Sequence, residues 1–336
     1  TRCREVSWAR DVYKRQDQGS GDMTRIFYVC DIHGSETVWR KVLNAIPAYK
    51  VDVVIVNGDL TGKAIVPIVK IKENEWYCAP WGKGQILRSE KEVEHVIKIY
   101  SGKGFYPYIT SEEELKELKN NPDKVKELFT LLMKKRLRTW IDLVKEKVTS
   151  DMTIIVSPGN DDRVEIDEVL KADDRVIYPL KKVVYIDDHP MISCEWVNST
   201  PWNTPRECPD EELEKLLEEE FNRVDSYENL ICCFHAPPYN THLDIATKLD
   251  KNLKPVTRFG LPVKTHVGSK AVRKSFEKYQ PLLGLHGHIH ESKGSDRIGN
   301  TLCINPGSEY EEGILKACVI DLPPRGRKIK FHFVEG

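Results

Sequence analysis

The chain has 336 residues, of which 40% are hydrophobic and 31% are charged. This composition is typical of a globular protein with enough apolar material for one large domain or two smaller ones. Lysine plus arginine (51) nearly balance aspartate plus glutamate (52), for a formal net charge of -1. That balance argues against a protein that binds nucleic acid through bulk positive charge. No apolar run approaches the roughly 20 residues that span a bilayer, so no membrane partner is expected.

The cysteines indicate a reducing compartment. There are nine, an odd number with irregular spacing and no Cys-x-x-Cys pair. Most lie in apolar runs, which is typical of buried thiols and not of a disulfide framework. Because the N-terminal segment also lacks the apolar stretch of a secretory signal, we expect a cytoplasmic protein.

The first 22 residues differ from the rest of the chain. They are polar and without periodicity, and a convincing strand begins almost directly after Met23. We therefore expect residues 1–22 to be a non-native or disordered leader. Residues 23–336 are expected to form the functional domain.

The first elements of that domain alternate between strand and helix. Ile26–Cys30 is a predicted strand, and the helix that follows has its apolar residues on one face and should end at Pro47. Val51–Val56 is a second, buried strand. Strand, helix, strand is the order of an α/β protein with parallel strands. The polar residues after both strands stand where ligands bind in such sheets.

Residues 62–148 interrupt this pattern. Residues 62–122 contain several glycines and are expected to form short elements packed beside the core. The apolar stripe from Val125 to Val148 then predicts one long amphipathic helix. We therefore expect a partly helical insertion at about 62–148.

The second half of the chain is richer in strands. Helices are predicted over Asp210–Arg223 and Gly268–Tyr279. Short apolar runs bounded by turn residues predict eight further strands: Met152–Val156, Val183–Ile186, Met191–Glu195, Leu230–Phe234, Leu282–Leu285, Thr301–Ile304, Leu315–Ile320 and Lys328–Val334. Together the elements predict two sheets with helices outside them.

Five polar clusters each follow an apolar strand. They are Asp31-x-His33, Gly58-Asp59, Gly159-Asn160, His235 and Gly287-His288-x-His290. Carboxylate, amide and imidazole ligands suit manganese, iron, zinc and similar ions. Each cluster alone is common in turns and cores. Five of them in this order, each at the end of a strand, predict a metal site.

This ordered set resembles the calcineurin-like metallophosphoesterase superfamily, from Ile26 to about Ile320. The resemblance implies an α/β fold, a four-layer αββα sandwich of two mixed β-sheets flanked by helices, with a dimetal site at the strand ends. It assigns the ligands as follows: Asp31, His33 and His290 to one metal, Asn160, His235 and His288 to the second, and Asp59 as the bridge. The stretches His235-Ala236-Pro237-Pro238 and Asn305-Pro306-Gly307-Ser308 also resemble motifs of the superfamily.

The resemblance also implies an activity. Such a protein is a metal-dependent phosphoesterase that hydrolyses a phosphomonoester or phosphodiester, with a hydroxide shared by two divalent ions as nucleophile. Mn²⁺ is the first expectation, and Fe, Zn, Ni or Co also suit the ligands. The expected partner is a small phosphoester substrate. The sequence names neither that substrate nor the oligomeric state.

One motif departs from the superfamily pattern. Many members have Gly-Asn-His-Asp/Glu, whereas this chain has Asp161 in place of the histidine that protonates the leaving group or contacts the phosphate. A carboxylate there repels a dianionic monoester. The general acid is therefore open among Asp161, His286, which precedes the Gly-His-x-His turn, and His242.

Further candidates concern the substrate. Asn160 and Arg163 are candidate phosphate-binding residues, although an arginine in this place is also typical of a solvated helix start. Trp202 and Asn203 lie in a loop before an acidic helix, where they either line a substrate pocket or fix the loop onto the core.

Two other functions remain open. One is a scaffold of the same fold that has lost catalysis, which the replaced histidine favours and the complete set of seven ligands disfavours. The other is a nuclease, which requires a basic channel that the near-neutral charge does not support.

Overall fold

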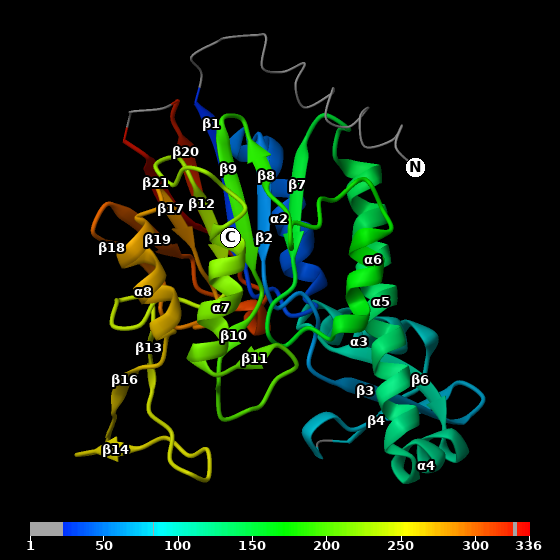
Figure 1. Ribbon diagram of the computed structural model, residues 1–336. Helices are drawn as coiled ribbons and strands as arrows, with labels where there is room; N and C mark the ends of the chain where they lie inside the picture. The colour runs from blue at the N-terminus through cyan, green and yellow to red at the C-terminus, as the bar shows by residue number, and fades with distance from the viewer. Residues whose placement is uncertain (1–22, 83, 325–327) are drawn as a thin grey trace.

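The computed structural model describes residues 23–82, 84–324 and 328–336. Within these ranges two β-sheets pack face to face, and helices cover both outer faces (Figure 1). The αββα sandwich expected from the sequence is therefore confirmed. The leader expected at residues 1–22 lies outside the described residues.

The first sheet carries three of the five clusters. Its strand order is β21-β20-β1-β2-β7, with β1, β2 and β7 parallel and the two C-terminal strands antiparallel to β1 and to each other. All five residues of β2 are buried, as expected for a strand covered on both faces. The bounds are β1 (Thr24–Cys30), β2 (Val53–Asn57), β7 (Thr153–Ser157), β20 (Lys316–Leu322) and β21 (Lys330–Glu335).

The second sheet carries the other two clusters. Its order is β18-β19-β17-β12-β9-β8, with a parallel centre and an antiparallel strand at each edge. The bounds are β8 (Val184–Ile186), β9 (His189–Cys194), β12 (Ile231–Phe234), β17 (Leu283–Leu285), β18 (Gly294–Ile298) and β19 (Thr301–Asn305).

Alternating side chains place the core in three layers. In β1, Ile26 and Tyr28 point between the sheets, where they meet residues such as Ile231 and Leu285 of the second sheet. Residues on the opposite faces pack against the helices. The first sheet is covered by α2 (Glu36–Tyr49), α5 (Pro122–Lys147) and α6 (Asp167–Lys171), and the second by α7 (Asp210–Phe221) and α8 (Lys270–Tyr279).

The prediction that the first helix ends at Pro47 is wrong. Helix α2 continues to Tyr49, and Lys50 caps it in the left-handed conformation, donating its N–H to the Ile46 carbonyl. A proline in the last turn removes only one helical hydrogen bond, so the packing of Val42 and Ile46 against the sheet outweighs the loss.

The inserted region contains a small sheet of its own. The order β5-β4-β3-β6 encloses a separate apolar cluster beneath α3 that includes Ile68, Trp76 and Val93. The region is therefore richer in strands than the sequence indicated, whereas the long helix is confirmed as α5. The bounds are β3 (Ile65–Lys72), β4 (Glu75–Cys78), β5 (Gln85–Leu87), α3 (Glu90–Gly102), β6 (Tyr106–Ser111) and α4 (Glu112–Asn120).

Several short elements were not predicted, because each has too few apolar residues to show a period. Two strand pairs between residues 245 and 266 extend away from the body of the molecule (Figure 1). The unpredicted elements besides β18 are β10 (Val197–Asn198), β11 (Glu207–Cys208), β13 (Ile245–Thr247), β14 (Thr257–Arg258), β15 (Leu261–Pro262), β16 (Lys264–His266), and the 3-10 turns η1 (Pro80–Gly82), η2 (Val164–Ile166) and η3 (Tyr310–Glu312). No helix within the described ranges is long and apolar enough to cross a bilayer.

Candidate metal centre

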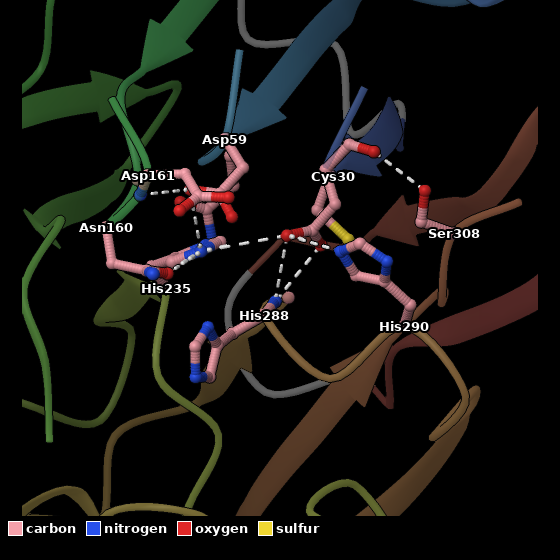
Figure 2. Close-up of polar contacts among 12 residues, drawn as sticks. Cys30, Asp59, Asn160, Asp161, His235, His288, His290 and Ser308 are labelled. Carbon is pink, nitrogen blue, oxygen red and sulfur yellow. Dashed lines mark hydrogen bonds and ion pairs between the residues drawn. The ribbon is translucent and has the colours of Figure 1, made fainter. Parts of the chain in front are cut away.

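The five clusters lie together because the strands that carry them end at one edge of the sandwich. Backbone hydrogen bonds join the loops after these strands. The His33 N–H donates to the Asp59 carbonyl at 2.8 Å, and the Gly287 N–H donates to the His235 carbonyl at 3.1 Å. Side chains separated by more than 250 residues therefore face one another (Figure 2).

The carboxylate and imidazole ligands form two groups that share one residue. The ligand atoms of Asp31, His33, Asp59 and His290 lie within 4.8 Å of one another, and so do those of Asp59, His235 and His288. The Asn160 Oδ1 lies 3.1 Å from the His235 Nε2 and so adjoins the second group. The structure thus brings all seven predicted residues together, divided around Asp59.

The atoms that face one another carry lone pairs. The Nε2 atoms of His33 and His290 are 3.1 Å apart. The His33 Nε2 is 3.6 Å from the Asp59 Oδ2, and the His290 Nε2 is 3.6 Å from the Asp31 Oδ1. This convergence of imidazole nitrogens and carboxylate oxygens is the arrangement that a divalent cation requires.

The electrostatics of the cluster also call for a cation. Asp31 and Asp59 are buried, and burial raises the pKa of a carboxyl; for Asp31 the histidines His290 and His235 outweigh burial and hold the pKa at about 2. Burial lowers the pKa of His235, but Asp59 and Asp31 outweigh it and raise that pKa to about 9. The two carboxylates therefore favour positive charge at this point of the cluster. A divalent ion would supply that charge, so the residues fit the metal.

The backbone at these residues is strained. Asp31, His33, Asp59 and His288 have φ angles of 52°, 39°, 43° and 66°, in the left-handed region that most residues avoid. Such strain concentrates at functional sites, where the surrounding fold maintains it. Gly58 is required beside them, because a Cβ there would lie 1.9 Å from the His235 Nδ1.

Comparisons with known proteins agree with this architecture. No family model matches the chain. One solved crystal structure, 17% identical, covers 92% of this chain and 98% of its own with a TM-score of 0.55. The chain therefore shares the overall fold of that structure.

Two further solved structures are less similar to this chain. TT1561 of Thermus thermophilus is 13% identical, with a TM-score of 0.49 over 92% of this chain and 98% of its own. A protein described as an archaeal phosphodiesterase is 13% identical, with a TM-score of 0.40 over 93% of this chain and all of its own. Both TM-scores are below 0.5.

One curated protein is related in sequence. It is the uncharacterized protein MJ1162 of Methanocaldococcus jannaschii, 37% identical over 158 residues. The match spans 46% of this chain and 64% of the length of that relative.

A chain of polar contacts orients Asn160. Its Nδ2 donates to the Thr204 Oγ1 at 2.8 Å, and the Thr204 hydroxyl donates to Glu207. Glu207 also accepts the backbone N–H of Thr204 at 2.9 Å. The amide oxygen is therefore turned toward His235. This contact was not predicted, because Thr204 is 44 residues from Asn160 and belongs to no motif.

The carboxylate of Asp162 joins the loops that hold Asp59 and Asn160. It accepts backbone N–H groups of Leu60 at 2.8 Å, Thr61 at 2.9 Å and Gly159 at 2.9 Å, and the Thr61 hydroxyl at 2.6 Å. Burial, followed by the charge of Asp59, raises the pKa of Asp162 to about 6. This residue positions the loops and does not face the metal ligands directly.

The Asn-Pro-Gly-Ser turn supports the Gly-His-x-His turn of this fold. The Asn305 Nδ2 donates to the carbonyls of Gly287 at 3.3 Å and Ile289 at 3.0 Å. The Ser308 hydroxyl donates to the Asp31 carbonyl at 2.7 Å (Figure 2). The Asn-Pro-Gly-Ser turn therefore lies beside the site and fixes two of its loops.

The structure contradicts the prediction that His286 is a general acid. Its side chain is fully buried behind the metal ligands, and its Nδ1–H donates to the carbonyls of Phe234 and Ala236, both at 2.9 Å. Burial lowers the pKa of His286 to about 4, so the ring is neutral near pH 7. His242, the other histidine candidate, is exposed and pairs with Asp296 at 3.2 Å.

Arg163 does not face the ligands either, so the structure contradicts its role as a phosphate contact. Its Nη1 donates to the Lys126 carbonyl at 2.8 Å and to the Thr130 hydroxyl at 2.7 Å. Its guanidinium lies over the Phe129 ring at 5.0 Å, so the residue fastens the loop after β7 to α5. Trp202 is 60% exposed and does not fix its loop to the core.

Asp161 lies at the edge of the site beside a lysine that the sequence did not reveal. Its backbone N–H donates to the Asp59 Oδ1 at 2.9 Å. Its Oδ2 is 3.1 Å from the Lys63 Nζ and 3.9 Å from the His33 Nδ1. Burial lowers the pKa of Lys63, but the charges of Asp161 and Asp59 outweigh burial and raise it. The only sequence signal was a lysine four residues after Asp59.

Replacing Thr204 by valine should weaken metal binding. Thr204→Val removes the acceptor that orients Asn160, and the loss of such a supporting contact typically lowers metal affinity by roughly 10- to 100-fold. Mn²⁺ titration by calorimetry would show the weaker site. Thr139→Val, which removes an exposed hydroxyl on α5, is the control and should bind as wild type. Unchanged affinity in Thr204→Val would contradict the orienting role.

His286 should make stability depend on pH. Its pKa is about 4 in the fold and 6.5 ordinarily, so the unfolded chain binds the proton more tightly. The stability that the neutral ring contributes is complete above about pH 6.5 and is lost as the pH falls toward about 4, by about 3 kcal/mol. The free energy of unfolding in urea should therefore be measured for metal-free wild type and His286→Gln, and the difference between the two should narrow as the pH falls over this range. A constant difference would contradict the assignment.

Proposed function

We propose that this protein is a metal-dependent phosphoesterase that hydrolyses a phosphomonoester or a phosphodiester. The observation that carries the proposal is the pair of ligand groups that meet at Asp59. A carboxylate shared between two groups of ligands is suited to hold two cations close together, which is the arrangement used for displacement at phosphorus.

The seven residues divide the work of holding two ions. Asp31, His33 and His290 would bind the first, Asn160, His235 and His288 the second, and Asp59 both. Burial lowers the pKa of His33, and of His288 to about 4, so both rings offer a lone pair at neutral pH. Mn²⁺ is the first choice, and iron, zinc, nickel and cobalt are also compatible with these ligands. Two bound ions would supply an activated water and neutralise charge on the phosphoryl oxygens.

Lys63 would supply the remaining positive charge. Asp161, in place of the histidine of the superfamily, would repel an anionic phosphate, but the ammonium group of Lys63 lies 3.1 Å from it and offsets its charge. The side chain of Lys63 is half exposed, so a substrate can reach it. We propose that Lys63 binds a phosphate oxygen and that Asp161 positions Lys63.

The loop that carries Lys63 is fixed before any substrate arrives. Asp162 accepts three hydrogen bonds from Leu60 and Thr61. The next residue, Gly62, donates its N–H to the Tyr106 hydroxyl at 2.9 Å. Preorganised cations of this kind stabilise a phosphoryl transition state without the cost of rearrangement.

The first test is hydrolysis itself. Purified protein loaded with Mn²⁺ should hydrolyse bis(p-nitrophenyl) phosphate or p-nitrophenyl phosphate, followed by nitrophenolate absorbance. Asp59→Asn should lower kcat by at least roughly two orders of magnitude, because the shared charge is lost. Asp188→Asn changes an exposed carboxylate and should be as active as wild type. A folded, metal-loaded wild type that is inert toward both compounds would favour a scaffold.

The role of Lys63 is separable from metal binding. Lys63→Gln should raise KM, and raise the Kd of inorganic phosphate measured by calorimetry, by roughly 10- to 100-fold, the scale of one charged hydrogen bond. Lys63→Arg should restore most of the affinity because it keeps the charge.

Two controls complete this test. Lys72→Gln removes a lysine whose partner is Glu75 and should change neither constant. Metal content should stay equal in all variants. Tight phosphate binding by a fully loaded Lys63→Gln would contradict the role of Lys63 and leave the metal centre intact.

A further inference from the structure

Residues 245–266 form a projecting arm, here called the basic arm. At its base β13 pairs with β16, and at its tip β14 pairs with β15. A bridge between Leu249 and Pro255 connects the two parts. The arm extends beyond the sheets and helices of the sandwich (Figure 1).

The base of the arm is fixed next to the metal centre. The buried Asp244 accepts a contact from the His266 Nδ1 at 2.7 Å and the backbone N–H of Gly268 at 3.0 Å. The Ser292 hydroxyl donates to the Ile245 carbonyl at 2.7 Å. Glu291, directly after His290, accepts the Thr247 N–H at 3.3 Å. The arm is therefore attached to the Gly-His-x-His turn itself.

The arm is strongly basic although the protein is not. Five cations and one carboxylate give it a formal charge of +4, whereas the whole chain carries -1. Lys264 pairs with Glu291 at the base. In the part of the chain that the structure describes, the other four cations have no carboxylate partner within ion-pair distance, and all are exposed: Lys248, Lys251, Lys254 and Arg258.

The tip of the arm is apolar. Phe259 is 94% exposed and Leu261 72%. Phe259 and Gly260 have φ angles of 52° and 79° and form the turn between β14 and β15. Asparagine and glycine are usual in such a turn, and a bulky aromatic residue there is costly. The ring contacts the guanidinium of Arg258, 5.6 Å from its centroid, and gains little burial in return.

We propose that the basic arm docks on an anionic lipid surface. Phe259 and Leu261 would enter the interface between headgroups and acyl chains, and the lysines and Arg258 would contact headgroup phosphates. An apolar tip surrounded by unpaired cations is the combination that such a surface binds. The absence of a spanning apolar run concerns insertion across a bilayer, and docking on its surface needs no such run.

Two other partners match the arm less well. Single-stranded nucleic acid is bound by stacking on several aromatic rings, and the tip offers one ring, that of Phe259. A second copy of this chain would need free carboxylates to receive the four positive charges of the arm. On the acidic helix α7, Glu214 and Glu218 already pair with lysines of α8. Lipid is therefore the partner that the residues favour.

Vesicle co-sedimentation of the full chain tests the proposal. Wild type should bind phosphatidylcholine vesicles that contain phosphatidylglycerol and should not bind phosphatidylcholine alone. Replacing Lys251, Lys254 and Arg258 together by alanine should weaken binding roughly 100-fold. Phe259→Asn with Leu261→Ser should weaken it roughly 10-fold or more. Asparagine suits the turn better than phenylalanine and Leu261 is 72% exposed, so this variant should fold as wild type does.

Matched controls keep the result specific. A triple alanine variant of the exposed Lys91, Lys98 and Lys119 removes the same charge elsewhere, and Leu131→Ala removes an exposed leucine of α5. Both should bind vesicles as wild type does. All arm variants should hydrolyse a soluble substrate at the wild-type rate. A wild type that binds vesicles but hydrolyses no phosphoester would overturn the proposed function and leave the docking proposal intact.

Three outcomes would overturn the docking proposal. The first is absence of binding to the anionic vesicles, and the second is equal binding to both kinds of vesicle. The third is a wild type that does not bind vesicles but forms a dimer or binds single-stranded DNA, when the arm variants lose that property.

Discussion

The feature on which this structure depends is the burial of two carboxylates, Asp31 and Asp59, where the two sheets end together. A buried carboxylate is costly unless positive charge lies beside it. Four imidazoles from three separate loops surround these two, and the charges of Asp59 and Asp31 raise the pKa of His235. The loops thus converge where positive charge is needed to offset two buried carboxylates, and a divalent cation would supply that charge.

The loops reach this arrangement at a conformational cost. Four of the seven ligand residues have left-handed backbone, which an isolated loop would avoid. Contacts remote from the metal maintain it: Asp162 spans two loops, Asn305 holds the Gly-His-x-His turn, and Thr204 with Glu207 turns the amide of Asn160. The residues that touch the metal are therefore only part of what specifies the centre.

The sequence predicted the parts of the structure that repeat a simple rule. Apolar strands and amphipathic helices have periods, so the strands of the two sheets other than β18, and the covering helices other than the short α6, could be predicted. The seven ligands stood out because each cluster followed such a strand. The antiparallel pairs of residues 245–266 were not predicted, since their short and polar strands have no period.

Side-chain direction was the other limit of sequence reasoning. His286 and Arg163 occupy promising positions along the chain, yet one points behind the ligands and the other toward α5. Conversely, Lys63 and Thr204 belong to no motif and still face the site. A position in sequence places a residue near an edge of the sheet, and only packing decides which way it turns.

The contact between Asp162 and Thr61 has a consequence for the architecture of the chain. These residues are 101 positions apart, and the inserted region and β7 lie between them. Their hydrogen bonds fasten the loop after β7 to the loop after β2. The spacing of Asp59 and Asn160 is therefore set at this edge of the sheet and not by the long stretch of chain that separates them. The small sheet of the inserted region, which has an apolar cluster of its own, can change over evolution without moving either residue.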